Sequence, residues 1–357
     1  MKLSQKDTNR YSRHLLLDKV GIEGQLKLKQ AKVLVIGAGG LGCPVLQYLG
    51  AAGIGEIGII DFDVIDESNL QRQILFTVND IGKSKSKTAK LKVEAQNPLI
   101  TVVAYDFELT NLNAIELFKQ YDIIVDGTDN FSTRYLVNDA CVLVKKPLVY
   151  GAIHKFEGQV SVFNYQNGPT YRCLFPNPPE LGSMPSCSEV GVIGVLPGVI
   201  GTQQANEVLK MVLGIGKVMS GELLIYNALD PSFLQLKINK SVNLSDIGIN
   251  SIYDFEKFDY SLSCVVIEKE FSKSDLDKLS KATLVLDVRE AWETPKVENK
   301  TVINIPLDEL DGCIANIPKN ETVYVACQKG GRSQVAIDFL RAEYNYTNLI
   351  NIDGGVG

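Results

Sequence analysis

Apolar runs alternate with helical patterns along the first part of the chain. Four short apolar runs have the composition of buried parallel strands, at residues 32–37, 56–61, 101–106 and 122–127. The segments between them place apolar residues at the spacing of a helix face. Strands and helices in strict alternation predict an α/β fold with a Rossmann-like, doubly wound sheet.

The pattern changes after residue 147. Alternating apolar and polar positions at residues 147–153, 159–165, 222–228 and 233–239 predict an antiparallel extension of the sheet. Between them, residues 177–186 read as a mobile loop. Residues 241–260 are polar and irregular, and periodic apolar positions resume at residue 284. We therefore predict a first domain at 1–240, a linker at 241–261 and a small α/β domain at 262–357.

Composition narrows the function classes. With 45% hydrophobic and 22% charged residues the chain is expected to be globular, and its net charge of -6 gives no basic field for nucleic acid or anionic lipid. The first residues lack a signal-peptide pattern, and the apolar stretch 190–201 is too short to span a bilayer. Seven scattered cysteines argue for reduced thiols. A cytoplasmic protein is expected.

A glycine fingerprint follows the first strand. Gly37, Gly39 and Gly42 match the Gly-x-Gly-x-x-Gly turn of dinucleotide-binding domains, and Asp61 stands about 20 residues on, where such domains hold a ribose. By this motif alone NAD is the leading interpretation. In NAD enzymes, however, the pyrophosphate is bound and never broken, so backbone groups suffice.

Cationic and acidic residues beyond Asp61 favour a different chemistry. Breaking a phosphate bond requires cations and a metal, and the sequence offers Arg72, Lys85 and, after the strand at 122–127, Asp129. Each has a simpler explanation. The lysines could form a solvated helix face, Arg72 a surface ion pair and Asp129 a helix N-cap.

Six segments in order carry a family resemblance. They read RYSRHLLL, GAGGLG, DFDVIDESNLQRQ, GKSK, DGTDN and GVLPGVIGTQQANEVLK. Residues 8 to 240 thereby resemble the MoeB/ThiF adenylyltransferases, relatives of the ubiquitin-activating enzymes. The resemblance implies a homodimer that uses MgATP to adenylate the C-terminal carboxylate of a small ubiquitin-like carrier ending in Gly-Gly, with release of pyrophosphate.

The resemblance also assigns residues. It implies nucleotide contacts for Gly39, Gly40, Asp61, Ser68, Asn69, Gln71, Arg72, Lys85, Asp129 and Asn130. Among these Asp61 would hold the ribose, Asp129 would bind Mg²⁺, and Arg13 would reach the ATP of the neighbouring subunit. A carboxylate nucleophile is already ionised at neutral pH, so no general base is needed.

Two cysteines bear on a metal and on acyl transfer. Relatives commonly carry zinc on two Cys-x-x-Cys pairs, but here Pro176 stands where Cys173 would have its partner, and the second pair is missing. One thiol cannot build a four-coordinate site, so we predict that structural zinc is absent. Cys187 matches a loop cysteine of relatives. Ordinary burial and a role as acyl acceptor or disulfide partner both stay open for it.

The second domain has a cysteine loop of its own. Cys327 follows an apolar strand and Arg332 closes the loop before a helix, with four residues between them, where dual-specificity phosphatases have five. Residues 280 to 357 resemble a rhodanese domain, with Asp287 and Arg289 matching its strand end. The resemblance implies a persulfide on Cys327, stabilised by Arg332 and loop N–H groups. The His-Ile-Pro-Gly-Ala segment that rhodaneses usually carry is replaced by VENKTVINIP at residues 297–306. Rhodaneses also continue into a further helix after the position that matches residue 357.

Together these features predict an ATP-dependent adenylyltransferase and sulfurtransferase for a sulfur-carrier protein, which takes sulfur from a persulfide donor and leaves a thiocarboxylate on the carrier. Molybdopterin biosynthesis is the nearest pathway, and carriers of thiamine, cysteine and tRNA-thiolation pathways stay open. An NAD-dependent oxidoreductase and a carrier-binding protein without turnover are the alternatives.

Overall fold

The computed structural model describes residues 2–178, 191–230, 232–260, 271–273, 276 and 278–357. The chain forms two compact units, and the described residues of the first run from Lys2 to Tyr260. Those of the second run from Phe271 to Gly357. Among the described residues, no helix combines the length and the apolar character needed to cross a membrane.

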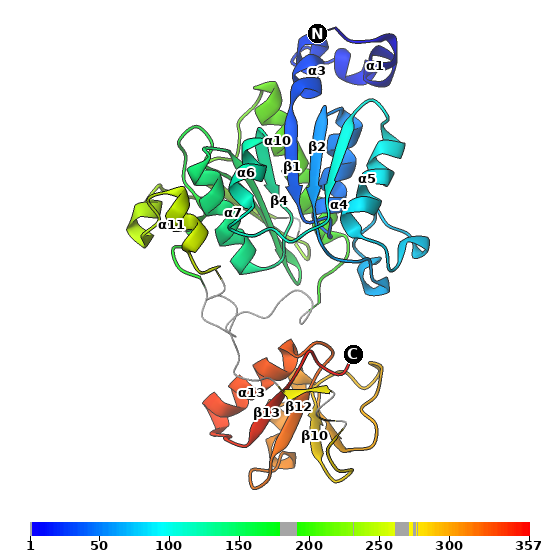
Figure 1. The fold of residues 1–357 in the computed structure, drawn as a ribbon, viewed down its shortest axis with the longest axis vertical. Helices are drawn as coiled ribbons and strands as arrows, with labels where there is room; N and C mark the ends of the chain where they lie inside the picture. Colours follow the sequence, from blue (N-terminus) through cyan, green and yellow to red (C-terminus); the bar gives the residue numbers. More distant parts are fainter. Residues whose placement is uncertain (1, 179–190, 231, 261–270, 274–275, 277) are drawn as a thin grey trace. The chain divides into compact units, whose positions relative to one another are not determined.

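The first unit is built on an eight-stranded sheet with the order β3-β2-β1-β4-β5-β6-β7-β8 (Figure 1). Its strands are β1 (Lys32–Ile36), β2 (Glu56–Ile60), β3 (Thr101–Tyr105), β4 (Ile123–Asp126), β5 (Leu148–His154), β6 (Glu157–Phe163), β7 (Glu222–Asn227) and β8 (Phe233–Lys237). β1 to β5 are parallel, and β6 to β8 continue the sheet antiparallel. Both the doubly wound sheet and its antiparallel extension are confirmed.

Helices cover both faces of this sheet. They are α1 (Gln5–Arg10), α2 (Ser12–Leu15), α3 (Gly21–Gln30), α4 (Gly42–Ala52), α5 (Lys85–Gln96), α6 (Ala114–Lys119), α7 (Phe131–Leu143), α8 (Tyr171–Leu174), α10 (Leu196–Leu213) and α11 (Ile252–Lys257). Val33 and Val35 of β1 pack with α4, α5 and α10, whereas Leu34 and Ile36 pack with α6 and α7. Successive side chains of a strand point to opposite faces of the sheet, and here helices cover both faces, so every residue from Val33 to Ile36 is buried. This is why β1 appears in the sequence as a continuous apolar run.

The segment expected to be a linker belongs to the core of the first unit. Leu244, Ile249 and Phe255 are buried among the side chains of α6 and α7, and Tyr260 donates a hydrogen bond to Asp139 Oδ2 at 2.8 Å. Sparse apolar residues in a polar stretch suffice to pack it. The predicted linker at 241–261 is therefore corrected, as far as residue 260, to a packed extension of the first unit.

The second unit is a five-stranded parallel sheet with the order β11-β10-β12-β13-β9. Its elements are β9 (Phe271–Ser272), β10 (Leu284–Asp287), β11 (Thr301–Asn304), β12 (Val323–Ala326), α13 (Gly331–Tyr344) and β13 (Leu349–Asp353). Leu286 and Val325 pack with the apolar face of α13, and Val285 packs on the other side of the sheet. The small α/β domain is confirmed.

Candidate active sites

The glycine loop joins β1 to α4 at the carboxyl edge of the first sheet. Gly37 has a φ of 86°, and a Cβ there would lie 2.9 Å from the carbonyl oxygen of Gly127, which follows β4. Glycine is thus required where two loops meet. A Cβ on Gly39 would meet nothing nearer than Gln73 Nε2 at 3.7 Å. Packing does not require glycine at Gly39, which fits a position where a phosphate approaches the backbone.

Asp61 ties the end of β2 to the glycine loop. Its Oδ2 accepts a hydrogen bond from the Ala38 N–H at 2.7 Å, and its Oδ1 accepts one from the Asp63 N–H at 2.9 Å. Burial raises the pKa of the Asp61 carboxyl, although the ammonium of Lys85 and the two N–H groups act in the opposite direction. Each carboxylate oxygen retains a lone pair for a ligand hydroxyl.

Lys85 begins α5 and is only 7% exposed. Its Nζ lies 2.7 Å from Asp63 Oδ2. The neighbouring lysines behave differently, because the side chains of Lys83 and Lys87 are 58% and 67% exposed, and they pair with Asp80 and Asp106. A solvated helix face therefore describes the neighbours of Lys85 and not Lys85 itself.

The loop between Asp61 and α5 turns back toward the glycine loop. Arg72 Nη1 donates to the Ser68 carbonyl oxygen at 3.1 Å, and a Cβ on Gly40 would lie 3.5 Å from Arg72 Cγ. Asn69 Oδ1 accepts from the Asp66 N–H at 3.2 Å and so shapes the short helix that precedes Arg72. Gln71 packs against Gly194, two residues before α10. The structure brings these four predicted residues to the same edge as Gly40 and Asp61.

Asp129 lies in the loop after β4, at the same edge, and its side chain is exposed. The helix N-cap is its neighbour Asn130, whose Oδ1 accepts from the Thr133 N–H at 2.9 Å, so the N-cap explanation does not hold for Asp129. Sequence reasoning missed the buried carboxylate Asp126, which accepts from the Thr128 N–H at 2.9 Å and shapes this loop. Burial raises the pKa of Asp126, opposed by Arg134.

Arg13 is the predicted residue that the structure does not bring to this edge. It is exposed on α2, and the adjacent Tyr11 receives a hydrogen bond from Asn97, just beyond the end of α5, at 2.8 Å. Lys85 stands at the other end of α5, a helix of 12 residues and hence about 18 Å long. Arg13 therefore lies far from the site of its own chain.

Cys173 is half-buried, and its Sγ accepts hydrogen bonds from the N–H groups of Thr170 and Ser241, both at 3.4 Å. Burial acts to raise the pKa of this thiol, but the hydrogen bond with the Thr170 hydroxyl and the backbone hydrogen bonds outweigh it and lower the pKa. The described part of the chain holds no cluster of three or more His, Cys, Asp or Glu side chains fit for a metal. The absence of zinc stays a prediction. Cys187 lies outside the described residues.

The second unit places Cys327 at the end of β12, directly before the loop that leads into α13. Cys327 is 1% exposed, and its Sγ accepts from the Gly330 N–H at 3.1 Å. Ser333 Oγ lies 3.4 Å from this sulfur and 2.9 Å from the Gly330 carbonyl oxygen, so its one hydroxyl hydrogen is shared between the two acceptors. Gly330 has a φ of 90°, which turns its N–H toward the sulfur. The sequence reasoning missed Ser333, although it directly follows Arg332.

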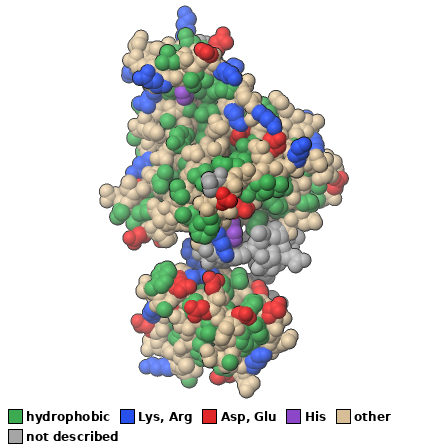
Figure 2. Space-filling model, turned by 180° about the vertical axis from the view of Figure 1, so that it is seen from behind, with side chains coloured by type: hydrophobic (Ala, Val, Ile, Leu, Met, Phe, Trp, Pro, Cys, Tyr) green, Lys and Arg blue, Asp and Glu red, His purple; other side chains and the backbone are tan. Residues whose placement is uncertain are grey.

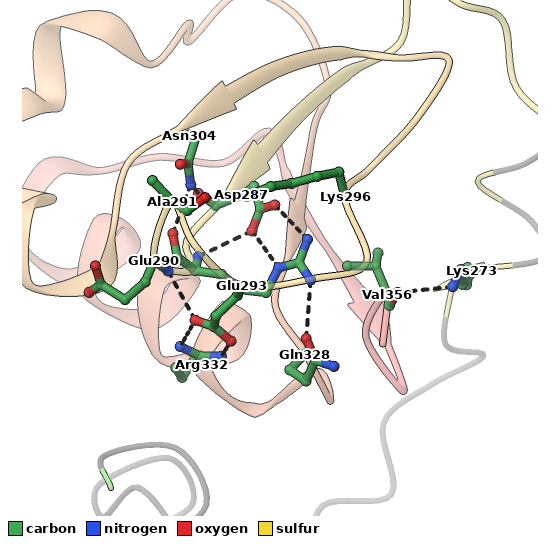
Figure 3. A network of polar contacts seen from close by, with 11 residues as sticks. Lys273, Asp287, Glu290, Ala291, Glu293, Lys296, Asn304, Gln328, Arg332 and Val356 are labelled. Carbon is green, nitrogen blue, oxygen red and sulfur yellow. Dashed lines mark hydrogen bonds and ion pairs between the residues drawn. The ribbon is translucent and has the colours of Figure 1, made fainter. Parts of the chain in front are cut away.

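Two carboxylates hold the arginines beside this loop (Figure 3). Arg289 donates to both oxygens of Asp287, at 2.9 and 2.8 Å, and its Nη1 donates to Gln328 Oε1 at 3.1 Å. Arg332 donates to both oxygens of Glu293, at 2.7 and 2.5 Å. The sequence reasoning expected Arg332, with the loop N–H groups, to stabilise the charge on the sulfur, and it assigned Arg332 no carboxylate partner. The missed partner Glu293 lies in the same DVREAWE segment as Asp287.

Family comparisons agree with these two sites. The sequence profile of the ThiF family matches residues 11–245, about two thirds of the chain. The chain belongs to the ThiF family. A rhodanese-like domain matches residues 272–357, so this ThiF protein carries a C-terminal rhodanese-like domain. It is accordingly an enzyme of the adenylyltransferase and sulfurtransferase class.

Three relatives match most of the chain. It is 41% identical over 374 residues to the probable adenylyltransferase/sulfurtransferase MoeZ of Mycobacterium tuberculosis, covering 99% of this chain and 93% of the relative. It is 52% identical over 267 residues to the sulfur carrier protein adenylyltransferase of Thermus thermophilus, covering 72% and 98%. It is 42% identical over 367 residues to the probable molybdopterin-synthase adenylyltransferase of Porphyra purpurea, covering 99% and 93%.

A solved structure shares the fold of the first unit. Escherichia coli MccB with ATP matches with a TM-score of 0.58 and 24% identity, covering 67% of this chain and 73% of that one. At this identity the match supports the fold alone.

Proposed function

We propose that this enzyme uses MgATP to adenylate the C-terminal Gly-Gly carboxylate of a ubiquitin-like sulfur-carrier protein. It then converts the product to a thiocarboxylate with sulfur carried on Cys327, in molybdopterin biosynthesis. The observation that carries the first step is the convergence of Gly40, Asp61, Arg72 and Lys85 on one sheet edge. Relatives named for sulfur carrier protein and for molybdopterin synthase support the choice of carrier.

The first step brings two anions together. The carrier carboxylate attacks the α-phosphorus of ATP, a new C–O–P link forms, and the bond to the leaving pyrophosphate breaks. In this proposal the ribose hydroxyls donate to Asp61, and the phosphates bind Arg72, Lys85 and the backbone of the glycine loop. Lys85 exchanges its contact with Asp63, whose side chain is 54% exposed, for a phosphate oxygen. Preorganised cations lower the barrier because they neutralise both the approach and the departing charge.

Asp129 fits a magnesium ligand. Mg²⁺ usually takes one or two protein carboxylates and completes its coordination with water and substrate phosphates, so a single exposed carboxylate at the sheet edge is a suitable donor. The ion would supply positive charge beside the phosphates. Asn130 stands beside it but is committed to capping α7.

The homodimer is the second part of the proposal. Arg13 lies at the far end of α5 from Lys85, so it can serve a nucleotide only in another subunit. An apolar groove of about 560 Å³ lies between α4 and α10, lined in part by Tyr48, Ile74 and Val195, each more than half exposed. Exposed apolar side chains gathered in one groove favour contact with a second copy.

The second step uses the rhodanese-like domain. A donor persulfide passes its outer sulfur to the Cys327 thiolate, and the loop N–H groups stabilise the charge of the new persulfide. The terminal sulfur of Cys327 then attacks the acyl-adenylate carbonyl, and AMP leaves. Release of the thiocarboxylate requires a second thiolate, and we assign that part to Cys187: it attacks the Cys327 sulfur of the acyl disulfide, a Cys187–Cys327 disulfide forms, and the thiocarboxylate leaves with the electron pair of the broken S–S bond. An external thiol then reduces this disulfide before the next turnover.

ATP–pyrophosphate exchange tests the proposal. The purified enzyme should exchange labelled pyrophosphate into ATP only when a carrier ending in Gly-Gly is present. A panel of carriers from molybdopterin, thiamine, cysteine and tRNA-thiolation pathways identifies the partner by its kcat/KM, and the molybdopterin carrier should rank first. If none of the carriers in the panel supports exchange, the alternative of a carrier-binding protein without turnover would be favoured. Reduction of NAD in place of pyrophosphate release would favour the oxidoreductase alternative.

A further inference from the structure

The charges of the two arginines beside Cys327 are cancelled by two carboxylates. Arg289 is paired with Asp287 and Arg332 is paired with Glu293, each through two hydrogen bonds to the two carboxylate oxygens (Figure 3). Two positive and two negative side chains sum to zero. The cysteine loop therefore offers an incoming anion no unpaired arginine.

Neutral groups hold the sulfur instead. The Gly330 N–H donates to Cys327 Sγ, and the Ser333 hydroxyl shares its one hydrogen between this sulfur and the Gly330 carbonyl oxygen. The N-terminus of α13 adds its partial positive charge. Lys329 brings a full charge to the loop, but its side chain is exposed, so solvent and salt screen it. The partial charges of one N–H group and a helix N-terminus can stabilise a single negative charge on sulfur, but they are too small to stabilise a doubly charged anion.

Glu293 is built into this arrangement. Its Oε1 accepts a hydrogen bond from the Glu290 N–H at 2.9 Å in addition to that from Arg332, and its side chain is only 12% exposed. Burial acts to raise the pKa of the Glu293 carboxyl, but Arg332 and the Glu290 N–H outweigh it and hold the pKa below its ordinary value. Glu293 is therefore ionised near neutral pH.

We propose that Glu293 determines which sulfur donor reaches Cys327, by excluding the dianion thiosulfate and admitting a singly charged persulfide. The inference rests on the sulfur-carrying role proposed for Cys327. To bind Arg332, a thiosulfate oxygen must displace a carboxylate of like charge, which is how interfaces reject wrong partners. A persulfide donor needs no arginine, because the Gly330 N–H and Ser333 already hold a single sulfur anion.

The chemistry is the same for both donors. The Cys327 thiolate attacks the outer sulfur, a new S–S bond forms, and the donor S–S bond breaks. Its electron pair leaves with sulfite when the donor is thiosulfate, and with the donor thiolate when the donor is a persulfide. Charge is conserved in each case, so the two reactions differ only in the charge that must enter the loop.

Kinetics of the full-length enzyme test the proposal. Sulfur loaded on Cys327 is discharged to cyanide and measured as thiocyanate, with either thiosulfate or the persulfide of N-acetylcysteine amide as donor. The Glu293→Gln variant should lower the KM for thiosulfate about tenfold, because it removes the repelling charge, and leave the KM for the persulfide unchanged. Glu293→Asp keeps the charge and should keep the high KM. Glu290→Gln, an exposed neighbour, is the matched control and should resemble wild type.

Wild type gives an independent measurement should the Gln variant not fold. Its KM for thiosulfate should fall as ionic strength rises, since salt screens the repulsion by Glu293. A KM that rises with salt, or one that is equal in wild type and Glu293→Gln, would overturn the inference. Wild type that takes sulfur from neither donor would overturn the role of Cys327 itself, and this inference with it.

Discussion

Lys85, at the edge of the eight-stranded sheet, is paired with Asp63, a carboxylate whose side chain is 54% exposed. Arg332, at the cysteine loop, is paired with Glu293, whose side chain is 12% exposed and which binds through both oxygens. A single contact to a half-exposed carboxylate is exchanged more easily, because water solvates that carboxylate when its partner leaves, whereas a bidentate pair with both partners largely buried is costly to break. The first site can thus release its cation to a triphosphate, and the second keeps its cation occupied.

The face of the molecule shown in Figure 2 offers no surface feature that accounts for this difference. On the face shown in Figure 2, acidic, basic and apolar side chains are interspersed, without one large basic patch. Charge selectivity therefore has to come from the pairs inside each site. We expect substitutions at the two sites to separate the two activities, and the predictions below go from the largest effect to the smallest.

Cys327→Ala should abolish sulfur transfer and leave adenylation near the wild-type rate, because the residues proposed to bind the nucleotide all lie in the first unit. Mass spectrometry of the carrier is the measurement. Wild type should yield a thiocarboxylate about 16 Da heavier than the carboxylate, and the variant should yield none. Ser333→Ala is the milder companion, since it removes only one donor to the sulfur. Equal thiocarboxylate from Cys327→Ala would mean that sulfur arrives by another route.

Lys85→Ala should slow ATP–pyrophosphate exchange by roughly 100- to 1,000-fold, the usual cost of removing one preorganised charge from a transition state. Lys87→Ala is the matched control, two residues along the same helix, with an exposed side chain paired to Asp106. It should exchange at the wild-type rate. Thermal melting of both variants checks that the fold is kept, and similar losses in the two would refute the special position of Lys85.

Arg13→Ala and Asp129→Ala should each lose most exchange activity, and mixing the two variants should restore part of it. In a mixed dimer one site combines an intact Asp129 with an intact Arg13 from the other subunit. Random mixing gives mixed dimers in half of the population with one good site each, so about a quarter of the wild-type activity is expected. No recovery after mixing would show that Arg13 does not act across subunits.

The sheet could be predicted from sequence because its signal is local. Val33 to Ile36 read as a buried strand, and the fold follows from repeats of that pattern. The residues proposed for the nucleotide were selected because their segments keep the family order, and their role stays a prediction. The Arg332–Glu293 pair could not be predicted, since it depends on how a loop closes onto a residue 39 positions away. Cys187 remains a prediction, because no described residue tests it.

The segment 241–260 was wrongly read as a linker because its packing also depends on tertiary contacts. A substitution at its end is predicted to have the smallest effect of those considered. Its apolar residues Leu244, Ile249 and Phe255 show no regular period, so only the tertiary structure reveals that they are buried. At its end, the Tyr260 hydroxyl donates to Asp139, which also accepts two hydrogen bonds from the buried Arg172.

Tyr260→Phe removes the hydroxyl from this buried network and keeps the ring. We expect it to lower the free energy of unfolding of the first unit by about 1–2 kcal/mol, because Asp139 loses one hydrogen bond while Arg172 still neutralises it. Tyr253→Phe, an exposed ring on α11, is the control and should change stability by less than about 0.5 kcal/mol. Denaturant unfolding followed by a probe in each unit is the measurement. A loss of stability in the first unit alone would show that the Tyr260 hydroxyl helps to hold residues 241–260 on that unit, and equal stability of the two variants would show that its hydrogen bond to Asp139 contributes nothing measurable.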